Sequence, residues 1–189
     1  MDVWCAIRTY PKHAEELGNP IPQEPVFFLK PESSVTPFNK IDTCGGDVHH
    51  EIELVVKLGH GLKPQKMALG LDLTKRSVQD KLKANGLPWA EAKAFSGAAI
   101  IGEWVDFDDR AKYELHINNK PVQSGSLDEM SWSVDDLLSK LADWAEIIEG
   151  DVLFTGTPSG VGPLMPGDSL TASLYVDGEC VSQEKATCF

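Results

Sequence analysis

The sequence has no run of about 18 consecutive apolar residues, so no transmembrane helix is predicted. Its first residues, MDVWC, carry neither a basic segment nor a long apolar one, and we therefore expect no signal peptide and a cytoplasmic protein. Internal repeats, low-complexity tracts and linker-like stretches are also missing, while prolines and glycines are spread along the length. These absences predict one compact domain over residues 1–189.

Cysteine and positive charge are both scarce. The four cysteines, Cys5, Cys44, Cys180 and Cys188, show no CxxC or other metal-ligand spacing. Without an export signal, reduced and mostly structural thiols are favoured over disulfides. A net charge of −12 argues against nucleic acid or an anionic membrane as a partner. An acidic chain can nevertheless carry a local basic pocket for a small anion.

The apolar pattern predicts more strands than helices. Strands are expected at residues 25–30 (a short buried one), 51–58, 112–118 and 152–154, and a hairpin at 169–184. A short amphipathic helix is expected at 74–85, closed by Gly86. The clearest helix follows the N-cap Ser133, with an apolar stripe of Leu137, Leu141, Trp144 and Ile148. We predict an α+β fold built on a rolled, mixed, mainly antiparallel sheet.

Two glutamates, Glu51 and Glu53, are the first candidates for chemistry. They lie two apart on a predicted strand, so both carboxylates point to one face. Adjacent like charges repel unless a cation or a proton lies between them, and an oxygen-only set favours Mg²⁺ or Mn²⁺. Taken alone, such a pair is more often a solvated strand face.

A third acid, Asp72, lies where an apolar strand gives way to the helix predicted at 74–85. An N-cap role is the simpler interpretation of an aspartate in that position. As a third carboxylate it would complete one face of a metal site and leave other positions open for substrate and water.

His13 and Glu16 form an HxxE pair that shares one face of a helical turn, so Glu16 could orient the imidazole as a general base. An exposed acidic turn is the alternative. For His49 and His50 we favour structural roles, because adjacent strand residues point to opposite faces.

The segment TGTPSGVG, residues 155–162, is rich in glycine but lacks the pattern of a phosphate-binding P-loop. It is either a tight turn or a carboxylate-binding loop that uses backbone N–H groups and the hydroxyls of Thr155 and Thr157. Lys30, Arg76 and Lys93 are candidate cations for an anionic substrate, although each alone is typical of a surface charge.

Together these pieces resemble the fumarylacetoacetate hydrolase family, in its small acylpyruvase-like and oxaloacetate-acting branch. The resemblance covers nearly the whole chain, and the TGTPSGVG segment and the ExE…DxTxR pairing are its specific parts. The motifs run in order as RTY with the HxxE pair, FLKP, HEIEL, DLTKR, PW, AKAF, GD and TGTPSGVG.

The resemblance implies a rolled mixed-sheet fold, usually a homodimer, with Mg²⁺ or Mn²⁺ held at Glu51, Glu53 and Asp72. It implies a catalytic dyad of His13 and Glu16. It further implies that Arg76, Gln79, Lys93, Thr157 and Lys30 contact the substrate, with Lys93 also stabilising a developing oxyanion.

The chain departs from the family pattern at four places. Ile7 stands where a glycine is usual, and Thr9 where an asparagine is usual. Residues 60–71 form a shorter segment than their family counterpart, and residues 96–102 lack the usual proline-containing turn. Residues 128–132 add acidic side chains near a segment that often reaches the site. All metal-ligand positions survive these departures.

The resemblance implies an enzyme for a small anionic 2-oxo acid. The expected reaction is hydrolysis of the C–C bond in an acylpyruvate such as fumarylpyruvate, through a metal-stabilised enolate. The alternative at the same site is keto–enol tautomerisation or decarboxylation of oxaloacetate. A third possibility, motivated by the shortened segment before Asp72, is a non-catalytic relative that binds a small acid or a protein partner.

Overall fold

The computed structural model describes residues 1–16, 18 and 22–189. The α-helices are α1 (Pro11–Glu16), α2 (Arg76–Ala84), α3 (Ala90–Lys93) and α4 (Val134–Ala142). Short 3-10 turns lie at Glu32–Ser34, Cys44–Gly46, His60–Leu62 and Leu127–Glu129. The strands are β1 (Val3–Ile7), β2 (Val26–Lys30), β3 (Val35–Pro37), β4 (Lys40–Ile41), β5 (Val48–His50), β6 (Ile52–Leu58), β7 (Pro64–Asp72), β8 (Thr74–Lys75), β9 (Ala99–Ile101), β10 (Val105–Asp106), β11 (Lys112–Ile117), β12 (Lys120–Ser126), β13 (Val152–Phe154), β14 (Gly162–Pro163), β15 (Ser169–Val176) and β16 (Glu179–Cys188).

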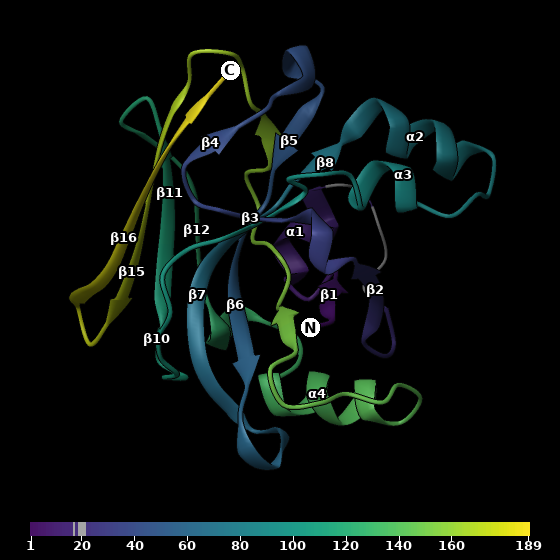
Figure 1. The fold of residues 1–189 in the computed structure, drawn as a ribbon, viewed down its shortest axis with the longest axis vertical. Coiled ribbons are helices and arrows are strands. Elements are labelled where there is room, and N and C mark those ends of the chain that lie inside the picture. The colour runs from purple at the N-terminus through teal and green to yellow at the C-terminus, as the bar shows by residue number, and fades with distance from the viewer. Residues whose placement is uncertain (17, 19–21) are drawn as a thin grey trace.

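The strands form three sheets. The largest has the order β2-β1-β13-β6-β7-β9-β3, with β10 added beside β7; the second has the order β12-β11-β15-β16-β4, and the third β14-β5-β8. Parallel pairing occurs between β1 and β13, β3 and β9, and β4 and β16, and the other pairs are antiparallel. Figure 1 shows the two larger sheets as curled layers, with α4 at one end and α2 and α3 at the other. The predicted α+β fold on a mainly antiparallel sheet is confirmed.

The hydrophobic core holds in place β6 and β7, the two strands next to which the candidate site lies. Between the two larger sheets, side chains of β6 and β7 pack with those of β11 and β15, including Leu54, Leu69, Leu115 and Leu174. A second cluster places Val56 and Leu58 of β6 against α4. Because β6 belongs to both clusters, its backbone is held along most of its length.

The strand predicted at 25–30 is present as β2, but the prediction that it is buried is wrong. Val26 is 43% exposed and Leu29 is 46% exposed. In the described part of the chain β2 pairs with β1 and ends the sheet there. An edge strand of this kind covers one side only, which its apolar composition does not reveal.

The helix predicted after Ser133 begins as expected and ends early. Ser133 and Asp136 form a reciprocal capping box, and Leu137 and Leu141 are fully buried. The helix ends at Ala142, so Trp144 and Ile148 do not continue its buried stripe and are 60% and 55% exposed. Trp144 instead meets the ring of Trp4 edge-on, with 5.6 Å between centroids.

The turns follow the predicted chemistry closely. Gly86 has a φ of 64° just beyond α2, which begins at Arg76 and not at residue 74. Asp177 and Gly178, with φ of 51° and 84°, connect β15 to β16, and β16 runs past the predicted end to Cys188. The four cysteines are free thiols.

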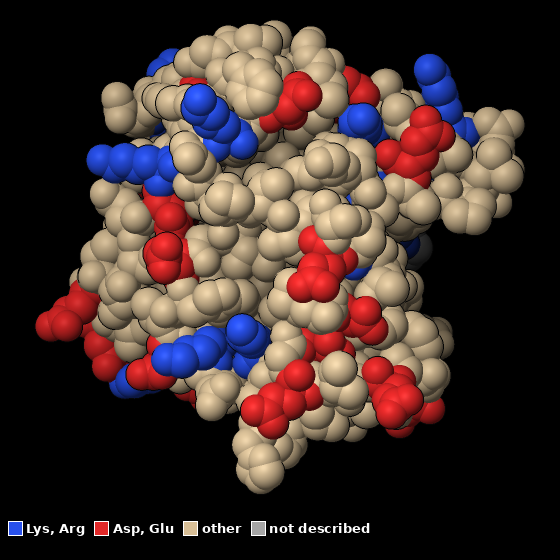
Figure 2. All heavy atoms as spheres, viewed as in Figure 1, with Lys and Arg blue, Asp and Glu red and all other residues tan. Residues whose placement is uncertain are grey.

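The described helices include none long and apolar enough to cross a membrane. On the face seen in Figure 2, acidic and basic side chains are interspersed, so no extended basic surface is visible there.

Candidate metal centre and active site

The strand register brings the three predicted carboxylates together. In the β6–β7 pair Ile52 lies opposite Leu71, and Asp72 N donates to Glu51 O (2.9 Å) one step further along. Asp72 is therefore the cross-strand neighbour of Glu51, with Glu53 two residues away on the same face. Glu51 itself lies in the short gap between β5 and β6, and not inside one continuous strand as predicted.

The three carboxylates match the size of a divalent-cation site. One oxygen from each of Glu51, Glu53 and Asp72 lies within 4.8 Å of the others, and all three residues are buried. Adjacent ligands of an octahedral Mg²⁺, at about 2.1 Å each from the ion, lie about 3 Å apart. The three oxygens would therefore have to move together by at most about 2 Å to close around an ion.

The electrostatics of the carboxylates also fit a cation. Burial and the nearby charges of Asp72 and Glu51 raise the pKa of Glu53 well above its usual range, although Gly156 N donates to its Oε2 (2.7 Å). Asp72 Oδ1 contacts Lys30 Nζ at 2.7 Å, but outside hydrogen-bond geometry. Among the described residues this buried oxygen has no hydrogen-bond donor. A bound cation would relieve the repulsion and satisfy the oxygen.

Two basic side chains compensate the charge of Glu51. Lys93 Nζ lies 2.9 Å from Glu51 Oε2 and 2.7 Å from Asp72 Oδ2, and Arg76 donates to Glu51 Oε1 at 2.7 Å. Burial alone would raise the pKa of Glu51, but Lys93 and Arg76 outweigh it and lower that pKa. Burial would likewise lower the pKa of Lys93, but Asp72 and Glu51 raise it above its usual range. Lys93 is therefore a fixed cation.

Lys30, predicted to contact substrate, lies behind the site. It is 0% exposed, and its ammonium donates to Ala98 O (2.6 Å) and Leu73 O (3.3 Å) in addition to pairing with Asp72. Its contacts within the described residues thus hold Asp72 in place and do not face a substrate.

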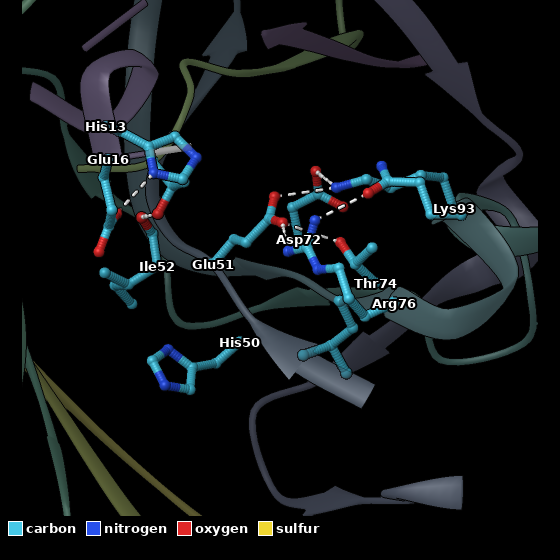
Figure 3. A network of polar contacts seen from close by, with 12 residues as sticks. His13, Glu16, His50, Glu51, Ile52, Asp72, Thr74, Arg76 and Lys93 are labelled. Atoms are coloured by element: carbon cyan, nitrogen blue, oxygen red, sulfur yellow. Dashed lines mark hydrogen bonds and ion pairs between the residues drawn. The ribbon is translucent and has the colours of Figure 1, made fainter. Parts of the chain in front are cut away.

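His13 and Glu16 approach from the other side. Their contact joins His13 Nδ1 to Glu16 Oε2 at 3.1 Å, and Gly160 N donates to both Glu16 oxygens at 3.1 and 3.2 Å. The HxxE pair is thus anchored to the glycine-rich segment. Figure 3 shows His13 and Glu16 on one side of Glu51, with Lys93 and Arg76 on the other.

A cavity of about 60 Å³ opens among these groups. A single water molecule needs at least about 10–15 Å³, so the cavity has room for bound water. Eight of the predicted site residues line the cavity: His13, Glu51, Glu53, Asp72, Arg76, Gln79, Lys93 and Thr157. Glu16 and Lys30, which were also predicted, are not among its lining residues. Arg76 also donates to Gln79 Oε1 (2.7 Å).

The threonine hydroxyls of the glycine-rich segment are committed to the backbone. Thr155 Oγ1 donates to Leu54 O (2.9 Å), and Thr157 Oγ1 donates to Ile52 O (2.8 Å). Each hydroxyl has one proton, so neither can also donate to a substrate carboxylate. In this conformation both hydroxyls are therefore engaged with the backbone, and a contact of Thr157 with the substrate stays a prediction.

A buried glutamine, Gln123, ties the site together and was not identified from the sequence. Its amide nitrogen donates to Thr157 Oγ1 (2.9 Å) and Pro158 O (2.8 Å). Its oxygen accepts from Ile52 N (3.1 Å) and lies 2.8 Å from His50 Nδ1. Gln123 therefore contacts His50 and Ile52, the residues immediately before and after Glu51. Its position in β12, far away in sequence, gave no signal.

His50 has a structural environment, as predicted. It is 3% exposed, and burial lowers its pKa against the opposing effects of Gln123 and Glu51. The group of possible metal ligands found in the described residues consists of the three carboxylates alone.

The cavity wall also contains Arg8, Lys83 and Trp89, to which the sequence assigned no role. For Lys83 a signal existed, because Arg76, Gln79 and Lys83 follow the i, i+3, i+7 spacing of one helix face.

Known proteins match nearly the whole length of the chain. Residues 2–184 match the family model "Fumarylacetoacetate (FAA) hydrolase C-terminal". The chain is 36% identical to oxaloacetate tautomerase YcgM of Escherichia coli strain K12, over 90% of this chain and 87% of that protein. It is 34% identical to the mitochondrial oxaloacetate tautomerase FAHD2 of Oryza sativa subsp. japonica, over 96% of this chain and 91% of that protein.

Solved structures give the same picture. A candidate fumarylacetoacetate isomerase/hydrolase from Oleispira antarctica superposes with a TM-score of 0.94 at 36% identity, covering 100% of this chain and 93% of the other. Fumarylpyruvate hydrolase from Pseudomonas aeruginosa, in complex with Mn²⁺ and pyruvate, superposes with a TM-score of 0.89 at 30% identity, covering 100% and 89%.

Proposed function

Because the chain belongs to the fumarylacetoacetate hydrolase family, we propose that it is a divalent-cation-dependent oxaloacetate keto–enol tautomerase. The observation that carries the proposal is the buried group of Glu51, Glu53 and Asp72 in a cavity of about 60 Å³. We place oxaloacetate tautomerisation ahead of acylpyruvate hydrolysis, the reverse of the order expected from sequence, because the relatives at 34–36% identity are named oxaloacetate tautomerases.

Glu51, Glu53 and Asp72 would hold Mg²⁺ or Mn²⁺, which as a Lewis acid makes the C3 protons of a 2-oxo acid more acidic. His13 then moves the proton at C3, while solvent water exchanges the proton of the enol hydroxyl, so that the net change is the transfer of one proton between C3 and the oxygen. His13 Nδ1 faces Glu16, which leaves Nε2 as the nitrogen that exchanges a proton with C3, and the Glu16 carboxylate stabilises the imidazolium that results. The Lys93 side chain, which lies in the cavity wall beside Glu51 and Asp72, offsets the negative charge that develops on the 2-oxo oxygen.

The test is a UV assay of enol-oxaloacetate conversion with Mg²⁺, Mn²⁺ or EDTA. We expect cation-dependent turnover, and His13→Gln should lower kcat by about 10²–10⁴-fold, the usual contribution of a general base. Lys12→Gln, which changes an exposed neighbour on the same helix, is the matched control and should leave kcat unchanged. Cation-independent turnover, or full activity of His13→Gln, would refute this mechanism.

Hydrolysis of an acylpyruvate is the second candidate, supported by the likeness to fumarylpyruvate hydrolase. In that reaction His13 would activate a water molecule for attack at C4. Release of free pyruvate from fumarylpyruvate, with no conversion of enol-oxaloacetate, would favour this candidate. No turnover of any 2-oxo acid would favour the non-catalytic alternative. A homodimer and a cytoplasmic location stay predictions from the resemblance and the sequence.

A further inference from the structure

The outer part of the cavity carries positive charge that the proposed chemistry does not use. The carboxylates and Lys93 form its inner end, so a 2-oxo acid chelated there must direct its remaining atoms outward. Arg76, Gln79 and Lys83 lie on one face of α2, and Lys83 is the last of the three along the helix. Lys83 follows Arg76 by seven positions, so the two residues lie about 10 Å apart along the helix axis.

Lys83 is held at this position by an aromatic ring. Its Nζ lies 5.1 Å from the centroid of the Trp89 ring, within the range of a cation–π contact. Trp89 precedes α3 and also belongs to the cavity wall, so the contact keeps the ammonium group over the cavity while Lys83 stays exposed to solvent.

Other cations crowd the same space. Burial and the charges of Arg76, Arg8 and Lys93 lower the pKa of Lys83, whereas Asp80 has the opposite effect. Arg8 reaches the cavity from the end of β1 with a φ of 55°, a conformation that is uncommon for a residue other than glycine. Because carboxylates already pair with Arg76 and Lys93, Lys83 is a cation of this group that an added anionic group can engage.

We propose that Lys83, positioned by Trp89, binds the remote carboxylate of the substrate and makes the site selective for dicarboxylic 2-oxo acids over monocarboxylic ones. The inference rests on the proposed function only for the orientation of the substrate. It deepens that function, because oxaloacetate has such a second carboxylate and pyruvate does not.

The test uses two inert 2-hydroxy acids that chelate in the same way and differ in the remote group. Calorimetry would measure binding of malate, which has a second carboxylate, and of lactate, which does not, to the Mg²⁺-loaded protein. We expect Lys83→Gln to weaken malate binding about three- to tenfold, the range for a partly exposed charged contact, and to leave lactate binding unchanged. Lys83→Arg should retain the preference for malate.

Lys81→Gln is the matched control, because it removes the same charge from an exposed position of α2 outside the cavity wall. Equal weakening by Lys81→Gln and Lys83→Gln, equal loss of malate and lactate binding, or no malate binding to the wild type would each overturn the proposal. These measurements need no turnover. Lys83-dependent malate binding by a protein that converts no 2-oxo acid would therefore support the subsite and refute the proposed function.

Discussion

At the scale of single residues, Glu53 differs from the other two carboxylates in what holds it. Lysine and arginine side chains contact Glu51 and Asp72, whereas Glu53 accepts a hydrogen bond from the backbone of Gly156 and has a raised pKa. Removing its charge should therefore affect cation binding without harming the fold.

Glu53→Gln tests this distinction. The amide keeps an oxygen for the Gly156 N–H and removes the like-charge repulsion, so the cation-free protein should be as stable as wild type or more stable. Mn²⁺ affinity should fall by more than about 100-fold, beyond the usual effect of losing a supporting group around a metal site. Calorimetric titration and thermal unfolding with EDTA measure the two quantities.

Asp72→Asn is the contrasting variant, because Asp72 pairs with the buried Lys30 and Lys93. It should destabilise the cation-free protein by about 3–5 kcal/mol, as expected when a buried ion pair loses one partner. Equal destabilisation by the two variants would contradict the distinction drawn here.

Gln123 offers a second test at this scale. Replacing it with leucine removes four contacts and leaves buried groups, such as the Ile52 N–H and the Pro158 C=O, without their hydrogen-bond partner. At about 1–3 kcal/mol for each unsatisfied group, the free energy of unfolding in urea should fall by about 3 kcal/mol or more. Gln23→Leu, at an exposed position before β2, should stay within about 0.5 kcal/mol of wild type. A similar loss in both variants would refute the special role of Gln123.

At the scale of elements, the glycine-rich segment links catalysis to the fold. Gly160 has a φ of 100°, and a Cβ added there would lie 2.2 Å from Val122 O. Its N–H also donates to Glu16. Gly160→Ala should shift this segment, weaken the hydrogen bond to Glu16 and lower kcat by about tenfold, less than the roughly 10²–10⁴-fold expected when the general base itself is removed.

Gly150→Ala is the matched control, because Gly150 has a similar φ of 95° and its added Cβ would meet nothing within 4 Å. It should cost about 1–3 kcal/mol of stability through backbone strain alone and leave kcat unchanged. Comparison of kcat and urea unfolding for both variants separates crowding from strain, and equal kcat values would refute the role of the segment.

The sequence predicted elements well where local chemistry decides them. The N-cap at Ser133, the turn at Asp177–Gly178 and the i, i+2 pair of Glu51 and Glu53 all arise within a few residues. Features that depend on distant partners were missed. Two examples are the early end of α4, after which Trp144 packs against Trp4, and the contacts of Gln123 with the residues on both sides of Glu51. Both depend on tertiary contacts between segments that lie far apart in the sequence.

The candidate site divides in the same way. Eight side chains of the cavity wall were named in advance, with the family resemblance joining Asp72 to the two glutamates, whereas Arg8, Lys83 and Trp89 were given no role. Lys30 and Thr157 illustrate the limit, because only the coordinates show that the lysine lies behind Asp72 and that the threonine hydroxyl is already engaged. A residue type indicates what a group can do, and its hydrogen-bond partners decide whether it is free to do so.

At the scale of the whole molecule, cation binding should couple to stability. The ligands come from β7 and from the start of β6, so their arrangement exists only in the folded chain. A cation at 100 times its Kd stabilises by about 2.7 kcal/mol, which should raise the Tm by about 5–11 °C for a chain of this size. Calorimetric scans with Mn²⁺ or EDTA measure the shift, which should vanish in Glu53→Gln. Equal Tm values in wild type would contradict a cation site.

The three basic side chains around the carboxylates have a consequence for how the molecule matures. Lys30, Arg76 and Lys93 pair with Glu51 and Asp72, so two of the three buried carboxylates have a basic partner before any ion arrives. Small zinc domains stay unfolded until their metal binds. Here we expect the newly synthesised polypeptide to reach its native state in a cell short of magnesium or manganese and to acquire the ion afterwards, so that a shortage of the ion lowers the activity of the protein more than its survival.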